Sequence, residues 1–290
     1  NDILAGGPGN DVIYGGAGSD IFRYAPGDGS DVIWRDGSDI LELGPGITAD
    51  SFEFLGEGGN DNRALVIRFK DTGETIRLMY PCGGSGCNND TFRMQRIRFA
   101  DGTDMTAAEF ANRAVKSTAT DAPEQISGFD GVKNEIYALG GNDYLYGKSL
   151  DDTLDGGPGD DCLSGGPGND VLNGGPGSDI LEGGQGIDTY RFARGDGSDT
   201  VYAQSDDILE FGAGIVPDDL EFINGSGSSL TVRIRGTTDQ VYLSTAVGAM
   251  TFADGTVWTA DDILRRLSSV YGTEGADTLN GIAGRRNYLY

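Results

Sequence analysis

A nine-residue repeat rich in glycine and aspartate constrains the fold of this chain more than any other feature. Four adjacent units begin at Gly156 and read GGPGDDCLS, GGPGNDVLN, GGPGSDILE and GGQGIDTYR. Two more begin at Gly6 and read GGPGNDVIY and GGAGSDIFR. Upstream of Gly156 the pattern weakens to ALGGNDYLY and GKSLDDTLD. Self-similarity at a fixed period predicts a solenoid, in which each unit stacks on its neighbours.

Each unit follows the pattern G-G-x-G-x-D-x-U-x, where U is a large apolar residue. Glycine tolerates positive φ and close backbone approach, so the first six residues predict a turn and the last three a short strand. Alternate residues of a strand face opposite sides of a sheet, so the U residues are the predicted core. In the best-preserved block the predicted core residues are Leu163, Leu172, Leu181 and Tyr190, and the outward ones are Cys162, Val171, Ile180 and Thr189.

The charge balance and the absence of histidine limit which partners, metal ligands and catalytic mechanisms the chain can have. The 290 residues include 46 acidic side chains, 21 basic side chains and no histidine, which gives a formal net charge of -25. Such an acidic chain disfavours nucleic acid and anionic membranes as partners and favours cations. Without histidine, imidazole metal sites and Ser–His–Asp catalysis are excluded. The remaining metal ligands are oxygens, which suit hard cations such as Ca²⁺.

Calcium sites are predicted where like turns of the repeat stack. One nonapeptide makes half a coil, so each position-six aspartate lies near the turn two units later. Carboxylates and glycine carbonyls can then supply the roughly 6–8 oxygens that Ca²⁺ takes. Ordering one residue costs roughly 1–2 kcal/mol and burying one leucine returns about 1.5–3, so metal must contribute to folding. The expected stacked pairs are Asp143/Asp161, Asp152/Asp170, Asp161/Asp179, Asp170/Asp188 and Asp2/Asp20.

The predicted metal ligands are the position-six aspartates and the glycines of the same turns. The aspartates are Asp2, Asp11, Asp20, Asp143, Asp152, Asp161, Asp170, Asp179 and Asp188. The glycines are Gly6, Gly7, Gly9, Gly15, Gly16, Gly18, Gly141, Gly156, Gly157, Gly159, Gly165, Gly166, Gly168, Gly174, Gly175, Gly177, Gly183, Gly184 and Gly186. Asp277, in the isolated unit GTEGADTLN, is a weaker candidate.

A second acidic motif, GDGSD, follows the repeats at Gly27–Asp31 and again at Gly195–Asp199. It is interpreted either as a further Ca²⁺ site or only as a turn. Its candidate ligands are Asp28, Asp31, Asp196 and Asp199. The acidic pairs Asp36/Asp39 and Asp206/Asp207 are predicted to be solvated charges beside the next strand.

These repeats closely resemble the RTX (repeats-in-toxin) family, whose nonapeptide is the established calcium-binding example of this pattern. The resemblance implies a parallel β-roll, Ca²⁺ between turns, type I secretion and folding outside the cell. The chain departs from the pattern at three points, where no Ca²⁺ is placed. Leu150 replaces the glycine before Asp152, Asn134 replaces an aspartate, and Arg285 and Arg286 fall at the start of the last roll.

A longer period alternates the rolls with a different module, which resembles the haemolysin-type calcium-binding related domain. Predicted strands of the first copy are 39–43, 51–55, 64–69, 75–79 and 96–99, and those of the second are 207–211, 219–223, 230–235, 240–244 and 250–252. Capping boxes at Thr106–Glu109 and Thr259–Asp262 predict a short helix after each copy. The expected fold is all-β, with rolls over 1–31, 118–199 and 270–290 and modules over 32–117 and 200–269.

The expected function is that of a non-catalytic, calcium-dependent folding module within a larger secreted or surface protein, such as a toxin or adhesin. One alternative is the RTX tail of a secreted hydrolase, lyase or epimerase. Another is a glycan-binding module, suggested by Tyr137, Tyr144, Tyr146, Tyr288 and Tyr290. Cys82 and Cys87 are interpreted as a disulfide or as two free thiols. The sequence contains no run of about 20 apolar residues, so no membrane span is predicted.

Overall fold

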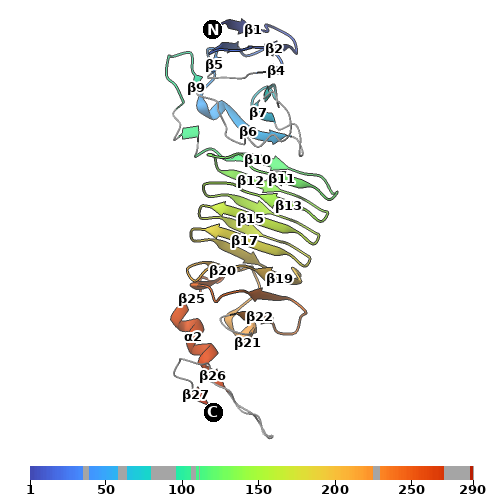
Figure 1. The fold of residues 1–290 in the computed structure, drawn as a ribbon, viewed down its shortest axis with the longest axis vertical. Coiled ribbons are helices and arrows are strands. Elements are labelled where there is room, and N and C mark those ends of the chain that lie inside the picture. Colours follow the sequence, from blue (N-terminus) through green and yellow to red (C-terminus); the bar gives the residue numbers. More distant parts are fainter. Residues whose placement is uncertain are drawn as a thin grey trace.

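The computed structural model shows an elongated stack of short strands, with the N-terminus at one end and helix α2 near the other (Figure 1). The structure describes residues 1–34, 39–57, 64–79, 96–105, 109–110, 112–224, 229–270 and 288–289. The predicted fold class, parallel β-rolls alternating with small β-rich modules, is confirmed. No helix among these residues is long and apolar enough to cross a membrane.

The first roll lies at the N-terminal end, and its strands alternate between two parallel sheets. One sheet has the order β1-β3-β5-β9, while β2, β4 and β8 begin a second, 13-stranded sheet. The bounds are β1 Ile3–Ala5, β2 Val12–Tyr14, β3 Ile21–Tyr24, β4 Asp31–Trp34, β5 Ile40–Leu43, β8 Thr75–Met79 and β9 Arg96–Arg98. Thus strands of the module, β5, β8 and β9, continue the sheets of the roll.

The second roll forms the regular middle of the stack (Figure 1). Its strands also alternate between two sheets, and each pairs in parallel with the strand one coil later. The pairing of Leu163 with Leu181 shows the predicted repeat of two nonapeptides per coil. The bounds are β10 Val115–Thr118, β11 Gln125–Ser127, β12 Asn134–Tyr137, β13 Tyr144–Tyr146, β14 Thr153–Asp155, β15 Cys162–Pro167, β16 Val171–Asn173, β17 Ile180–Gln185, β18 Thr189–Phe192 and β19 Ser198–Val201.

The first module joins the two rolls through an antiparallel insert. β6 (Phe52–Glu57) and β7 (Ala64–Phe69) pair antiparallel, and β7 pairs antiparallel with β8. The other edge of β6 pairs in parallel with β10, the first strand of the second roll. A single 13-stranded sheet therefore runs from the first roll through this module into the second.

The second module repeats this arrangement. Its antiparallel strands β21 and β22 extend the sheet of β19 through β23, and β25 closes the other sheet beside β24. The bounds are β20 Ile208–Phe211, β21 Leu220–Asn224, β22 Leu230–Ile234, β23 Gln240–Leu243, β24 Ala249–Phe252, β25 Val257–Thr259, β26 Ser269–Val270 and β27 Tyr288–Leu289. Single 3₁₀ turns at Ala49–Ser51 and Pro217–Asp219 precede β6 and β21. Each of the ten segments predicted as a strand contains one.

The core is thin and follows the predicted alternation. Leu163, Leu172, Leu181 and Tyr190 are at most 2% exposed, whereas Ile180, from the outward set, is 44% exposed. Cys162 is a half-buried free thiol on the outward side. Because each three-residue strand contributes one core side chain, the rolls bury little apolar surface per residue, and the modules add the larger aromatic clusters.

A helix completes the second module as predicted. Helix α2 (Ala260–Ser268) starts at a capping box, because the Asp262 amide donates to the Thr259 hydroxyl and the Thr259 amide donates to Asp262 Oδ2. Its residues Ile263 and Leu267 are buried in the core shared by the module and the second roll. Most of the corresponding segment after Thr106 lies outside the described residues.

Candidate metal centre

The aspartates that precede the strands stack into ladders connected by hydrogen bonds. In each step, a backbone N–H donates to the Oδ1 atom of the aspartate one coil later. For example, the Asp152 amide donates to Asp170 Oδ1 at 2.7 Å, and the Asp170 amide donates to Asp188 Oδ1 at 2.8 Å. All five predicted stacked pairs are present: Asp2/Asp20, Asp143/Asp161, Asp152/Asp170, Asp161/Asp179 and Asp170/Asp188.

The second roll contains two such ladders, one beside each sheet. The Asp152 ladder consists of Asn134, Asp152, Asp170, Asp188 and Asp207. The Asp143 ladder consists of Asp143, Asp161, Asp179 and Asp199. In the first roll the corresponding sets are Asp2, Asp20 and Asp39 and the pair Asp11 and Asp31. Asp2 and Asp11 lie near the end of the stack, where Asp2 is exposed and Asp11 is half-buried.

The second carboxylate oxygen of most ladder aspartates is buried and has no hydrogen-bond partner. These atoms are the Oδ2 atoms of Asp11, Asp20, Asp39, Asp143, Asp152, Asp161, Asp170, Asp179 and Asp188. An unpaired buried carboxylate oxygen is costly, and a repeated row of them requires a common explanation. A cation between the turns would compensate all of them in the same way.

The electrostatics of the ladders point in the same direction. In the second roll, burial raises the pKa values of Asp152, Asp161 and Asp170 from the ordinary 3.8, while hydrogen bonds from backbone amides oppose the shift. The pKa rises to about 6 for Asp161, Asp170 and Asp188, to about 7 for Asp152 and Asp179, and to about 8 for Asp199. The buried carboxylates thus lack a compensating positive charge within the protein.

Backbone carbonyls meet these carboxylates beside the first glycine of each turn. A Cβ atom on Gly147 would lie 2.5 Å from Asp152 Oδ2 and 2.6 Å from the carbonyl oxygen of Gly165. Beside Gly165, Asp170 Oδ2 and the carbonyl of Gly183 converge in the same way. Beside Gly156 the converging atoms are Asp161 Oδ2 and the carbonyl of Gly174. The nearest polar atoms in each of these spaces are therefore two oxygens, which suits a hard cation.

The remaining turn glycines are required by backbone conformation and by stacking. Gly157 and Gly159 have φ of +87° and +152°, which other residues rarely adopt. A Cβ on Gly159 would also overlap the carbonyl oxygen of Gly141 in the turn above. The same conformation is found at Gly7, Gly9, Gly16, Gly18, Gly141, Gly166, Gly168, Gly175, Gly184 and Gly186. Gly6, Gly15, Gly174 and Gly183 lie beside the carboxylate of their own turn, and Gly177 lies against the carbonyl of Gly159.

The prediction of solvated charges after the GDGSD motif is wrong at two positions. Asp39 and Asp207 are buried and accept the amides of Asp20 and Asp188 through Oδ1. They are therefore the last members of their ladders. Sequence spacing missed them because the last coil contains 19 residues rather than 18. Asp206 is exposed as predicted, and Asp36 lies outside the described residues.

The four aspartates of the GDGSD motifs divide into two kinds. Asp31 and Asp199 accept the amides of Asp11 and Asp179, so they end ladders. Asp28 Oδ2 instead accepts the amide of Ala25, three residues earlier, and Asp196 Oδ2 accepts the amide of Ala193 in the same way. Asp28 and Asp196 thus close their own turns, whereas Asp31 and Asp199 end ladders.

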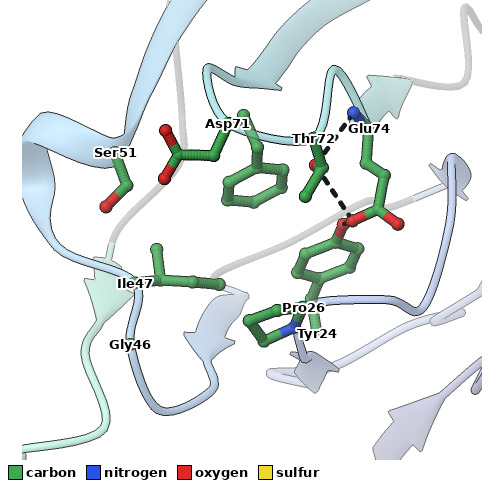
Figure 2. A pocket seen from close by; sticks show the side chains of 9 residues that line it. Tyr24, Pro26, Gly46, Ile47, Ser51, Asp71, Thr72 and Glu74 are labelled. Carbon is green, nitrogen blue, oxygen red and sulfur yellow. Dashed lines mark hydrogen bonds between the residues drawn. The ribbon is translucent and has the colours of Figure 1, made fainter.

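An acidic side chain from the module holds the first GDGSD loop in place. Figure 2 shows the Tyr24 hydroxyl directed at the Glu74 carboxylate, to which it donates at 2.8 Å. The Gly27 amide also donates to Glu74. In the second module, Asp239 accepts the Gly195 amide in the same way. These contacts link each module to the turn that ends the preceding roll.

A cavity of about 70 Å³ lies beside Glu74 in the first module. It is lined by Tyr24, Pro26, Gly46, Ile47, Ser51, Phe69, Asp71, Thr72 and Glu74 (Figure 2). In the second module, Arg194 donates to Asp219 at 2.6 Å and to the carbonyl of Gly214. Pro26 and Ser51 occupy the places of Arg194 and Asp219, so the first module lacks this bridge. The cavity has room for a few waters and is much smaller than a typical substrate pocket.

Comparison with known families identifies the repeats. Residues 1–33, 133–154, 155–190 and 269–285 match the RTX calcium-binding nonapeptide repeat. The rolls are RTX calcium-binding repeats. Residues 65–109 of the first module match the haemolysin-type calcium binding protein related domain. Both predicted resemblances are thereby confirmed, and Ca²⁺ is the metal that RTX repeats bind.

Whole-protein comparisons add little to this identification. No curated protein matches the chain. One solved structure that matches is the extracellular lipase LipA from Serratia marcescens, with 20% identity and a TM-score of 0.30. The match covers 84% of this chain but only 36% of the lipase.

The oxygens between the stacked turns come from both side chains and backbone. Among the described residues, no three acidic or cysteine side chains converge on one point. Each space between stacked turns is instead bordered by aspartate carboxylates and glycine carbonyls, and this donor set fits Ca²⁺. When bound, the ion would supply the positive charge that the ladders lack. Cys82, Cys87, Asp277, Arg285 and Arg286 lie outside the described residues, so those predictions stay open.

Proposed function

We propose that this chain is a calcium-dependent folding module of a larger secreted RTX protein, exported by type I secretion before it folds. The observation that carries the proposal is the row of buried, unpaired Oδ2 atoms in both rolls. Low cytosolic Ca²⁺ would leave these carboxylates uncompensated and the rolls unfolded. Extracellular millimolar Ca²⁺ is sufficient even for sites with a Kd of about 10⁻⁴–10⁻³ M.

The individual ligands of the proposal are the ladder aspartates and the glycine carbonyls between them. Within the second roll, Asp161, Asp170, Asp179 and Asp188 have the most complete surroundings, because each lies between two other aspartates of its ladder. Asp39, Asp31 and Asp199 are added as candidate terminal ligands. Asp28 and Asp196 are not included, since their carboxylates close local turns.

The test compares the full 290-residue chain in Ca²⁺, in Mg²⁺ and in chelator. Far-UV circular dichroism and small-angle X-ray scattering should show a compact β-rich chain in Ca²⁺ and an expanded, largely disordered chain in chelator. Mg²⁺ demands a smaller octahedral shell and should restore little structure. A chain that stays compact in chelator would exclude calcium-dependent folding.

The module is proposed to be non-catalytic, with any enzymatic activity located elsewhere in a longer protein. The supporting observation is the absence of histidine from the sequence. Esterase, protease, lyase and epimerase assays on the calcium-loaded chain should give no turnover. Activity intrinsic to these residues would overturn this part of the proposal.

A second candidate function, glycan binding, is favoured by one open cavity at the start of the second roll. This cavity has a volume of about 330 Å³ and is lined by Asp121, Tyr137, Leu139, Gly140, Asp155, Gly157 and Pro158. An aromatic ring beside two carboxylates can stack on a sugar and accept its hydroxyls. A glycan array probed with wild type and Tyr137→Ala in Ca²⁺ tests this candidate, and equal signals from both would reject it.

A further inference from the structure

Asn134 stands at the first position of the Asp152 ladder, where every later member is an aspartate. It is 1% exposed, and its backbone amide donates to Asp152 Oδ1 at 2.7 Å, as the other members of the ladder do. Its side chain fits the ladder, but it places an amide nitrogen where an aspartate has its second oxygen. This difference has direct consequences for the metal.

The side-chain amide of Asn134 makes hydrogen bonds both within its own turn and to the turns that follow it. Its Nδ2 donates to the carbonyl oxygens of Phe129 and Val132, both at 3.1 Å, and of Gly147 at 2.9 Å. It also lies 3.0 Å from Asp152 Oδ1. Its Oδ1 accepts the Phe129 amide at 2.8 Å. No oxygen of this side chain is left unpaired, in contrast to the ladder aspartates.

The space beside Gly128 corresponds to the spaces beside Gly147 and the later turns. A Cβ on Gly147 would lie between two oxygens, Asp152 Oδ2 at 2.5 Å and the carbonyl of Gly165 at 2.6 Å. A Cβ on Gly128 would likewise contact the carbonyl of Gly147, but the other polar atom beside it is a nitrogen, Asn134 Nδ2 at 2.7 Å. Two facing oxygens need a cation or a proton between them, whereas a nitrogen donor facing an oxygen forms a hydrogen bond without either.

We infer that the Asn134 side-chain amide takes the place of a calcium ion at this turn, so that the turn closes without metal. The row of calcium sites then begins with the oxygens of Asp152. This inference rests on the proposed calcium-dependent folding. It identifies the turn of Asn134 as the one that closes without Ca²⁺. The N–H group of the Asn134 side chain donates a hydrogen bond to the Gly147 carbonyl, so this oxygen is satisfied without a bound ion.

The turn of Asn134 lies at the junction between the second roll and the first module. β12 begins at Asn134 and pairs with β10, which in turn pairs with β6 of the first module. Asn134 therefore lies where the roll meets the module. A metal-independent turn at this junction gives the calcium-dependent coils a formed edge on which to stack.

The deciding variant is Asn134→Asp, which replaces the amide nitrogen by a carboxylate oxygen and adds one negative charge. Bound Ca²⁺ per chain is counted by native mass spectrometry and equilibrium dialysis at saturating Ca²⁺. We expect one ion more than in wild type. Asn169→Asp is the matched control. Asn169 lies on the exposed side of the turns and accepts the Ile187 amide. At the equivalent positions of other turns, Asp151 accepts the Asn169 amide and Asp160 accepts the Ser178 amide, so an aspartate fits this place. This control should leave the count unchanged.

A second variant keeps the inference testable should Asn134→Asp fail to fold. Asn134→Ala removes the amide without adding a ligand, and the ion count should equal that of wild type because no ion is lost. A count one lower in Asn134→Ala, or an unchanged count in folded Asn134→Asp, would overturn the inference. If wild type itself binds no Ca²⁺, the proposed function fails, and this outcome is distinct from both.

Discussion

The Tyr190 hydroxyl lies 3.3 Å from Asp207 Oδ2, at the last step of the Asp152 ladder. The hydroxyl also accepts the Gly183 amide at 3.0 Å, and the Gln204 amide donates to the same Asp207 oxygen at 2.7 Å. Burial raises the pKa of Tyr190, so it remains a neutral donor. Asp207 Oδ2 is consequently satisfied by protein groups, unlike the Oδ2 atoms of the earlier ladder members.

Tyr190→Phe should therefore destabilise the protein in Ca²⁺ by about 1–3 kcal/mol, because it removes a donor from a buried carboxylate. Chemical denaturation in saturating Ca²⁺ measures the effect. Tyr202→Phe, on a ring that is 52% exposed, is the control and should change stability by less than about 0.5 kcal/mol. Equal stability of Tyr190→Phe and wild type would show that the hydroxyl contributes nothing to this ladder.

Asp170→Ala should impair calcium binding at more than one place. Asp170 accepts the Asp152 amide and donates its own amide to Asp188, and its Oδ2 faces the Gly183 carbonyl. We expect the midpoint of a Ca²⁺ titration, followed by circular dichroism, to rise several-fold, together with a lower ion count.

Asp160→Ala is the matched control for this variant. It also removes one negative charge, but the Asp160 carboxylate accepts the Ser178 amide on the exposed side of the roll. Its titration should remain close to that of wild type. If Asp170→Ala titrated like Asp160→Ala, the stacked pairs would not be the calcium sites.

The metal-free protein should gain structure on mild acidification. Burial raises the pKa of ladder aspartates in the second roll, to about 6 for Asp161 and about 7 for Asp179, so the folded state binds more protons than the unfolded state. Their protonated forms favour folding below the ordinary pKa of 3.8, and this contribution is lost as pH rises through about 6–8. For one group, each unit by which the folded-state pKa exceeds the unfolded-state pKa corresponds to about 1.4 kcal/mol of folding free energy.

The measurement is the far-UV signal and thermal melting of calcium-free protein between pH 5.5 and pH 8, with Ca²⁺-loaded protein as control. We expect more β structure at about pH 5.5 than at pH 8 without metal. With Ca²⁺ the order should reverse, since protons compete with the ion for the same oxygens. Greater metal-free stability at pH 8 would contradict the assignment of the raised pKa values to the ladders.

The regular part of this fold could be predicted because the nonapeptide fixes the register. Leu163 pairs with Leu181 and Asp161 with Asp179 through the same 18-residue coil, so spacing alone located core and ladder. Asp39 was missed because it follows a coil of different length and precedes a strand of the module, where a flanking charge is usually solvated. A search for a further strand with Asp at its start, one coil later, would have found it.

Other features depend on contacts that no spacing reveals. Asn134 was identified as a departure from the repeat, but its donation to three carbonyls depends on the loop from Phe129 to Val132. Likewise, the different roles of Asp28 and Asp31 follow from which amide each carboxylate meets. Both cases turn on hydrogen-bond partners that lie on separate turns or loops.

Leu150→Gly should stabilise the calcium-loaded protein by about 1 kcal/mol. Leu150 replaces a repeat glycine and has φ of +70°, a left-handed conformation that is unfavourable for residues with a Cβ by about 1–2 kcal/mol. Its side chain is 38% exposed, so little packing is lost on truncation. The relief of backbone strain should exceed the greater freedom that glycine gives the unfolded chain. Thermal denaturation in saturating Ca²⁺ should show a higher melting temperature. The control is Pro158→Gly, in the next turn at a residue without positive φ, and it should lower the melting temperature. If Leu150→Gly also lowered the melting temperature, the leucine side chain would contribute more stability than its strained backbone costs.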